Sequence, residues 1–565
     1  MKLRYFLVMI STGCERRLLG ALAAVCLAPW LIACVTDVNH PPGTRTVRIS
    51  AAVVVIGLGL LEYYRAWWGF YVFLALWPHA LVVQELLIKC VSPLFEAFPK
   101  WWAGPAAAIL AMSYLFRSWA RGRRDACGTS VVILDSESES SNRRWSNAVR
   151  IGLWLLVLAW LVAMTCALFR TAHPGPDWKV ECTDLRHLLL PGPFSSLYPL
   201  LWTLEFLPSL ILGLALLNPS GRSNPDGRAT RPQIELLSPV LPMQRSAGVS
   251  PATLARLDQI LPVNTCVWIA CASGAVAAMY LLLQYLFDWH WSFDMTPPSG
   301  PFPNRNTTAP FLLITATLTM TLMAKASWTA RIGVGIAGLF QTLMALMLGS
   351  RNAWLMLVML LAIPLLRLKK WAMVGVCASL IAICVSVILW APLNKLASFT
   401  PQRILTTIEG ARINNLKQAT GDRQGIYQAA YEIFKTYPLT GSGPGTIHML
   451  AHRDSRFGAY IKDGDNYYPF FSHAHSIPIH LLAECGLLGM ASWVLLWLIL
   501  PVLAISRWKA GWSFATAVLI AGLGNLCDAC WFTPGMTTFC VLLLVLAFRN
   551  NEMSLTAHKT KTGAR

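Results

Sequence analysis

Long apolar runs recur along almost the whole chain, and they constrain its fold more than any other feature of the sequence. A run of about 17–25 apolar residues crosses the hydrocarbon core of a bilayer as a single α-helix. About fourteen runs of this kind are present, and we interpret each as a transmembrane helix. They cover residues 18–35, 47–64, 67–87, 101–117, 150–169, 196–217, 263–287, 309–324, 332–348, 353–366, 371–391, 477–505, 511–527 and 534–548. The sequence therefore predicts an all-α polytopic integral membrane protein.

The basic residues indicate how these helices are oriented. If the helices alternate in direction, both ends of the chain and the loops between Arg117 and Arg150 and between Arg222 and Arg256 fall on one side, which carries most of the lysines and arginines. Short cytoplasmic loops are enriched in these residues, so both termini are predicted to be cytoplasmic. The net charge of +19 is then a topology signal, and no nucleic-acid partner is predicted.

This topology divides the chain into three parts. Residues 1–391 hold most of the helices, with cytoplasmic loops at 118–149 and 218–262. Residues 392–476 form one large external loop, expected to carry the catalytic site, and residues 477–565 hold the last helices and a cytoplasmic tail. The 118–149 stretch contains SESESSNRR without an apolar period, so we expect a solvated linker there.

The external loop contains a predicted amphipathic helix beside the membrane. Apolar residues recur at helical spacing in RQGIYQAAYEIFKTYP, which begins at Arg423. Asp422 is placed to cap the start of this helix, and Pro438 with the glycines of LTGSGPGT ends it. The glycine-rich segment lacks the lysine of a nucleotide-binding loop, so it does not predict nucleotide binding.

Three arginines are predicted to lie at the external ends of helices. Arg305 precedes one apolar run, Arg351 occupies the short turn between two runs, and Arg423 opens the loop helix. A guanidinium group remains charged and matches phosphate oxygens two at a time, so such a cluster suits a lipid-linked pyrophosphate. For any one of these residues, the alternative is a flanking arginine that extends toward the interface.

His475 is a candidate general base. Ser476 is placed to cap the following helix, and Pro478 fits in its first turn, where no backbone donor is needed. The imidazole would then lie at the positive end of the helix dipole, which favours its neutral form. A neutral imidazole accepts the proton of an external hydroxyl group. The alternative interpretation is a solvated loop histidine.

A metal site is a weaker interpretation of the same region. His473, His475, His480 and Glu484 could supply four ligands. Their spacing is not that of an established zinc motif, and the H-E-x-x-H sequence is missing. His480 and Glu484 are more simply explained as a polar contact inside the helix bundle, so no metal is predicted.

The order of these motifs resembles the O-antigen ligase superfamily, which includes O-antigen polymerases and bacterial protein O-oligosaccharyltransferases. The resemblance rests on NRNTTAP (304–310), GSRNAW (349–354), GDRQGIYQAAYEIFKTYPLTGSGPGT (421–446) and HAHSIPIHLLAECGLLG (473–489). The residues that match in order are Arg423, Pro438, Gly441, Gly443, His475, Glu484 and Gly486. Ser476 stands where asparagine is common in the superfamily. The resemblance covers the chain from about residue 300 onward.

The resemblance implies a metal-free, inverting glycan transferase without a cofactor, at the outer face of the bacterial cytoplasmic membrane. Its donor would be an undecaprenyl-pyrophosphate-linked glycan, and its acceptor a hydroxyl group on a lipid A-core sugar, another glycan or a protein. His475 would be the base, and Arg351 and Arg423 would bind the pyrophosphate. Further substrate-binding candidates are Arg305, Gly441, Gly443 and His473. A ligase is the first hypothesis, with a polymerase or a protein O-oligosaccharyltransferase as alternatives, and a transporter of lipid-linked sugars as the hypothesis from another class.

Overall fold

The computed structural model describes helices from both halves of the chain. The residues described are 18–24, 27, 42–64, 67–79, 106–116, 137–172, 197–217, 263–287, 298–302, 304–348, 350, 352–354, 356–358, 360, 424–443, 447, 450, 462–463, 466–467, 474–507, 512–527 and 535–548. Among the predicted site residues, Arg351, Arg423 and His473 lie outside these ranges, and so does the predicted span at 371–391.

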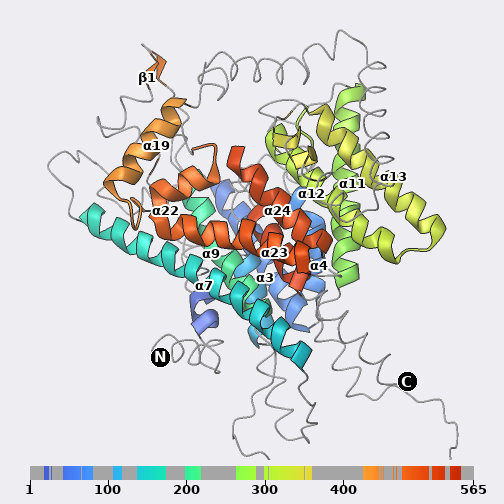
Figure 1. The fold of residues 1–565 in the computed structure, drawn as a ribbon, viewed down its shortest axis with the longest axis horizontal. Helices are drawn as coiled ribbons and strands as arrows, with labels where there is room; N and C mark the ends of the chain where they lie inside the picture. The colour runs from blue at the N-terminus through green and yellow to red at the C-terminus, as the bar shows by residue number, and fades with distance from the viewer. Residues whose placement is uncertain are drawn as a thin grey trace, which may run out of the picture.

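Helices dominate the described part of the chain (Figure 1). In chain order the helices are α3 (Pro42–Tyr64), α4 (Trp68–Leu76), η1 (Trp77–His79), α7 (Glu137–Ala172), α9 (Leu197–Leu217), α11 (Val263–Phe287), α12 (Arg305–Lys325), α13 (Trp328–Met347), α19 (Gln424–Thr436), α22 (Ile477–Val494), η3 (Leu495–Ile499), α23 (Leu500–Arg507) and α24 (Trp512–Cys527). Apolar helices also cover Ala106–Phe116 and Met536–Phe548. Two strands, β1 (Lys462–Asp463) and β2 (Asn466–Tyr467), pair antiparallel within the large loop.

Within the described residues, three helices are long and apolar enough to cross a membrane: Val263–Phe287, Trp328–Met347 and Ile477–Ile505. The first and third have the bounds that the apolar pattern predicted. Among the described residues, five shorter apolar helices fall inside other predicted spans, for example Phe206–Leu217 and Trp512–Leu526, and a sixth, Ala148–Ala163, overlaps the span predicted at 150–169. The chain is therefore a helical membrane protein, and the total of about fourteen spans remains a prediction.

The linker expected at 118–149 differs from the structure in its second part, because α7 already begins at Glu137. The acidic residues Glu137 and Glu139 stand in the first turn of this helix, where the helix dipole favours negative charge. Glu139 and Arg143 are four residues apart, a spacing that supports a helix without an apolar stripe. A polar composition alone therefore did not distinguish a solvated linker from the polar start of a long helix.

Helices α11, α12 and α13 pack together and share a buried polar network. The hydroxyl of Thr315 on α12 donates to Oε1 of Gln341 on α13 over 2.7 Å, and Nε2 of Gln341 donates to the carbonyl oxygen of Cys271 on α11 over 3.1 Å. Buried polar groups require such partners wherever water is excluded. Helix α12 is rich in threonine, and its hydroxyls bond back to the helix backbone, which explains how so polar a sequence is buried.

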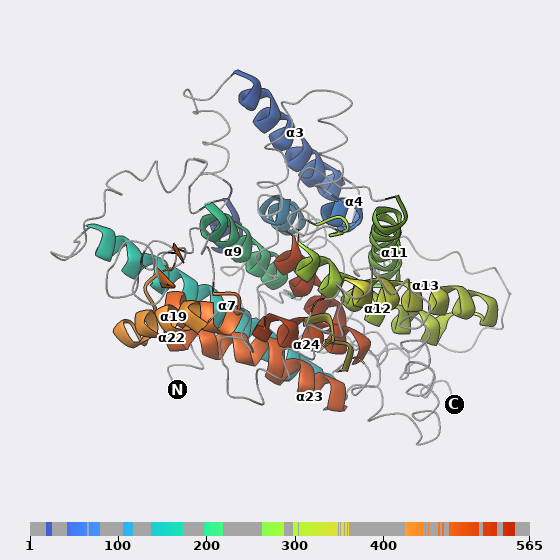
Figure 2. The ribbon, with the colours of Figure 1, turned by 90° about the horizontal axis from the view of Figure 1, so that it is seen from above.

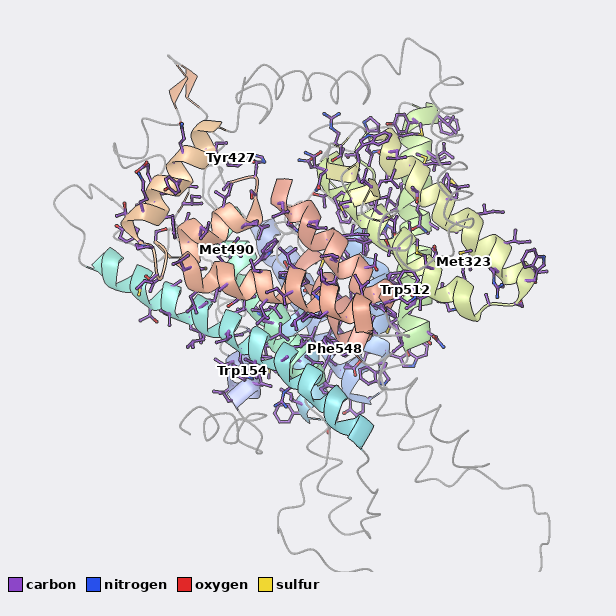
Figure 3. All side chains as sticks on the ribbon, in the orientation of Figure 1. Trp154, Met323, Tyr427, Met490, Trp512 and Phe548 are labelled. Carbon is purple, nitrogen blue, oxygen red and sulfur yellow. The ribbon has the colours of Figure 1, made fainter. Side chains whose placement is uncertain are left out.

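The two ribbon views agree on the arrangement around this trio. Helices α11, α12 and α13 lie on one side, α19 and α22 lie on the other, and α24 lies between them (Figures 1 and 2). The long helix α7 runs along α22, as both views show. Side chains fill the space between the ribbons, with Tyr427 of α19 and Met490 of α22 on the same side of the molecule (Figure 3). The described part of the large loop therefore meets the helix bundle at α22, through α19 and the residues that follow it.

Candidate functional site

The loop helix α19 packs its apolar face against the start of α22. The sequence predicted this face, and Ile426, Ala429, Ala430 and Ile433 are buried as expected. They pack in one cluster with Ala474, which precedes α22, and with Ala483, which lies in the first two turns of α22. The apolar face is thus occupied by protein contacts, and this packing holds α19 beside the segment that carries His475.

A glycine turn follows α19 and connects it to α22. Helix α19 ends at Thr436, before Pro438, as the sequence predicted. The N–H of Gly441 donates to the carbonyl oxygen of Tyr437 over 2.9 Å, which closes the turn. Gly441 has φ +69°, a conformation that glycine adopts without steric cost. A Cβ atom at Gly441 would lie under 3.0 Å from the backbone of Glu484 and Cys485, so glycine is also required there by the close approach of two backbones.

Helix α22 is kinked at Gly486, and the backbone around the kink forms hydrogen bonds with the glycine turn. Gly486 has φ +63° and ψ −159°, which is a backbone conformation adopted essentially by glycine alone. In an uninterrupted helix, the N–H of Leu487 would donate to the carbonyl of Ala483. Instead it donates to the carbonyl of Pro438 over 2.9 Å. The kink at Gly486 therefore frees helical backbone groups for bonds to a segment far away in the sequence.

The carbonyl groups that the kink frees accept bonds from the glycine turn. The Ala483 carbonyl oxygen accepts from the N–H of Ser442 over 2.8 Å and from its hydroxyl over 3.1 Å. The Glu484 carbonyl oxygen accepts from the N–H of Gly443 over 3.0 Å. The N–H groups of Gly441 and Gly443 are thus bonded within the protein. Both glycines therefore hold the turn in place, and their role in substrate binding stays a prediction.

His475 lies immediately before α22, in an unusual backbone conformation. It is half-buried between the buried residues Ala474 and Ser476, and its φ is +48°. A non-glycine residue in the left-handed region is uncommon, and such strain concentrates at functional sites. Ser476 occupies the N-cap position as predicted, but its side chain makes no capping bond. Pro478 lies in the first turn, also as predicted.

His480 and Glu484 form the buried polar contact that the sequence suggested. Nε2 of His480 lies 3.0 Å from Oε2 of Glu484, and both side chains are fully buried. Glu484 makes a second contact that the sequence did not reveal, because its Oε1 accepts from the N–H of Ile447 over 3.2 Å. No group of three or more potential metal ligands occurs among the described residues.

Arg305 belongs to the other group of helices. It is half-buried and begins α12, where the side chain of Asn304 accepts from the N–H of Asn306 over 2.9 Å and caps the helix. Arg305 interacts electrostatically with Tyr285, whose hydroxyl donates to the carbonyl oxygen of Met347 over 2.6 Å. The structure therefore places Arg305 at the same end of the α11–α12–α13 group as the C-terminus of α13. Arg351 follows that C-terminus by four residues in the sequence.

The opposite end of α12 is bonded to Arg331, which lies in the first turn of α13. Arg331 donates from Nε to the carbonyl oxygen of Met323 over 3.0 Å and from Nη2 to that of Ala326 over 3.2 Å. A cation at a helix C-terminus is stabilised by the helix dipole as well as by these bonds. About 30 Å of helix separates this end from Arg305. This length is close to the thickness of a bilayer's hydrocarbon core, and the external placement of Arg305 stays a prediction.

Comparison with known protein families matches residues 336–494 to the family described as O-antigen ligase. The match supports a relation of this segment to the O-antigen ligase superfamily. The segment runs from α13 to α22 and includes all of the predicted site residues except Arg305. No curated protein matches the chain. At the level of the family, this match supports an O-antigen ligase-like membrane glycan transferase. The family implies a lipid-linked glycan and an acceptor as substrates in general.

The matched segment also contains Gly486 and Glu484, for which the sequence predicts no catalytic or binding role. A glycine inside an otherwise helical pattern is a signal for close packing or a kink, and it would have marked Gly486. A carboxylate within an apolar helix is likewise a signal for a specific partner, which here includes the backbone of Ile447.

Proposed function

We propose that this O-antigen ligase-like protein transfers a glycan from undecaprenyl pyrophosphate to a hydroxyl acceptor at the outer face of the bacterial cytoplasmic membrane. His475 is the general base, Arg351 and Arg423 bind the pyrophosphate, and Arg305 and His473 contribute to substrate binding. The main support is the position of His475. It has a left-handed backbone conformation directly before a helix that is long and apolar enough to cross a membrane, and the neighbouring Ala474 packs against α19.

The proposed reaction is a single displacement at the anomeric carbon. The imidazole of His475 takes the proton of the acceptor hydroxyl as its oxygen attacks that carbon. The bond between the anomeric carbon and the pyrophosphate oxygen breaks, and undecaprenyl pyrophosphate leaves with the electron pair. Because attack and departure occur on opposite faces, the configuration inverts. The arginines stabilise the negative charge that develops on the leaving pyrophosphate.

The sequence position of Arg423 supports its part in this scheme. Arg423 immediately precedes α19, whose packing against α22 keeps the helix near His475. The N-terminus of a helix favours an anion through its dipole and its unpaired N–H groups. A guanidinium group at that place adds a charge-assisted bond to phosphate.

Arg423→Ala is expected to raise the KM for the lipid-linked donor by about 10- to 100-fold, because a hydrogen bond to a charged group contributes about 1.5–3 kcal/mol. The assay uses purified protein in lipid with an undecaprenyl-pyrophosphate-linked glycan and measures the released carrier. Lys435→Ala is the matched control, since Lys435 is an exposed cation of α19 that pairs with Glu432 over 2.7 Å. An unchanged KM in Arg423→Ala would remove Arg423 from the site.

The same assay identifies the acceptor class. Core lipid A, a second lipid-linked glycan and an acceptor protein are offered in parallel, and they distinguish a ligase, a polymerase and a protein O-oligosaccharyltransferase. Repeating the reaction with a chelator tests the proposed independence from metal ions. If no carrier is released with any of the three acceptors, the transferase proposal fails and transport of lipid-linked sugars becomes the leading hypothesis.

A further inference from the structure

Glu484 is a fully buried carboxylate whose two oxygens contact two different segments. Oε2 lies 3.0 Å from Nε2 of His480, one turn earlier on α22. Oε1 accepts a hydrogen bond from the backbone N–H of Ile447, which follows the glycine turn. Its backbone carbonyl accepts from the N–H of Gly443. One residue of α22 is therefore bonded to the backbone of both Gly443 and Ile447.

The same network reaches the proposed base. The N–H of His480 donates to the carbonyl oxygen of Ser476 over 2.9 Å, which forms the first turn of α22 directly after His475. The contact between the His480 and Glu484 side chains fixes that turn relative to the kink at Gly486. A displacement at Glu484 would therefore alter the placement of His475 and of the glycine turn together.

The stability of the fold does not by itself explain why His480 and Glu484 are buried together. Removing a carboxylate from water is costly, and its contacts repay that cost only with good geometry. Apolar residues of similar volume would often stabilise the same site equally well. A buried carboxylate that accepts from the backbone N–H of Ile447 does what apolar packing does not, because a hydrogen bond fixes the orientation of that backbone group.

We propose that Glu484 is a positioning residue for glycan transfer, which orients His475 relative to Gly443 and Ile447. This inference rests on the proposed function. Glu484 does not contact the substrate itself and acts through His480 and through the backbone of Ile447. Misplacing a catalytic group by about 1 Å lowers a rate by as much as about 100-fold.

The test compares Glu484→Ala with Glu484→Gln in the transfer assay. Glu484→Ala is expected to lower kcat by about 10- to 100-fold while the KM for the lipid-linked donor changes less than threefold, because positioning acts on the reacting groups. Glu484→Gln is expected to recover most of kcat, since its amide oxygen still accepts from the N–H of Ile447. Hydrogen exchange at this N–H is expected to be faster in Glu484→Ala and near wild type in Glu484→Gln.

Ser492→Ala is the matched control, because Ser492 is a buried polar residue of the same helix whose hydroxyl bonds only one turn back, to the carbonyl of Leu488 over 2.9 Å. It is expected to keep the wild-type kcat. If Glu484→Ala exposes the N–H of Ile447 to exchange but keeps the wild-type kcat, the positioning role is wrong. An equal loss in both Glu484 variants would also overturn it if Ile447 stays protected in Glu484→Gln. The variant of His475 described below tests the proposed function separately.

Discussion

His475→Asn is expected to reduce the rate of glycan transfer by about 100- to 10,000-fold, which is the usual contribution of a positioned general base. Asparagine is the informative substitution because it tolerates the left-handed backbone that His475 adopts at φ +48°. It also remains polar, so the half-buried position stays compatible with folding. The variant therefore removes the proton acceptor while it preserves the local structure. The measurement is single-turnover transfer with the undecaprenyl-pyrophosphate-linked donor in lipid.

Donor binding is expected to change little in this variant, because the proposal assigns the pyrophosphate to the arginines. A matched control is His558→Asn, since the sequence places His558 in the C-terminal tail, on the predicted cytoplasmic side. Wild-type transfer by His475→Asn would show that the imidazole is not the base. A loss of donor binding equal to the loss of rate would instead assign His475 to substrate recognition.

The elements that the sequence predicted well are those determined by local pattern. The apolar run at 263–287 coincides with α11, and the burial of Ile433 and its neighbours follows the helical period. Helix α19 ends before Pro438 because proline disfavours a helical conformation in the residue before it. These features depend on residues within a few turns of one another, so a single sequence contains the information that they require.

The features that the sequence did not predict arise from contacts between distant segments. The kink at Gly486 is stabilised by bonds to Pro438, Ser442 and Gly443, which lie far away in the chain. Position 441 requires glycine because the backbone of Glu484 lies too close for a Cβ atom. The second contact of Glu484 is a hydrogen bond from the N–H of Ile447, which is also distant in the sequence. The order of the motifs predicts that these residues belong to one site. Only the three-dimensional arrangement distinguishes the strained His475 from the residues whose contacts hold the glycine turn against α22.

The second large expected effect concerns Gly486, whose kink bonds α22 to the glycine turn. Gly486→Ala is expected to detach the glycine turn from α22 and to abolish measurable transfer. The backbone conformation of Gly486 costs a residue with a side chain at least about 1–3 kcal/mol. A Cβ atom there would also lie under 3.0 Å from the backbone of Leu439 and Gly441, which cannot move aside as a flexible side chain can. Helix α22 would relieve both conflicts by straightening at residue 486.

A straightened α22 would return the carbonyls of Ala483 and Glu484 to helical partners and withdraw them from Ser442 and Gly443. Hydrogen exchange at these two N–H groups is therefore expected to accelerate, together with the loss of transfer. Gly333→Ala is the control, because a Cβ atom at this exposed position of α13 meets nothing within 4 Å. It is expected to stabilise the helix by about 0.5–1 kcal/mol and to leave transfer unchanged. Normal transfer and normal protection of Ser442 in Gly486→Ala would show that the kink is not needed to hold the turn.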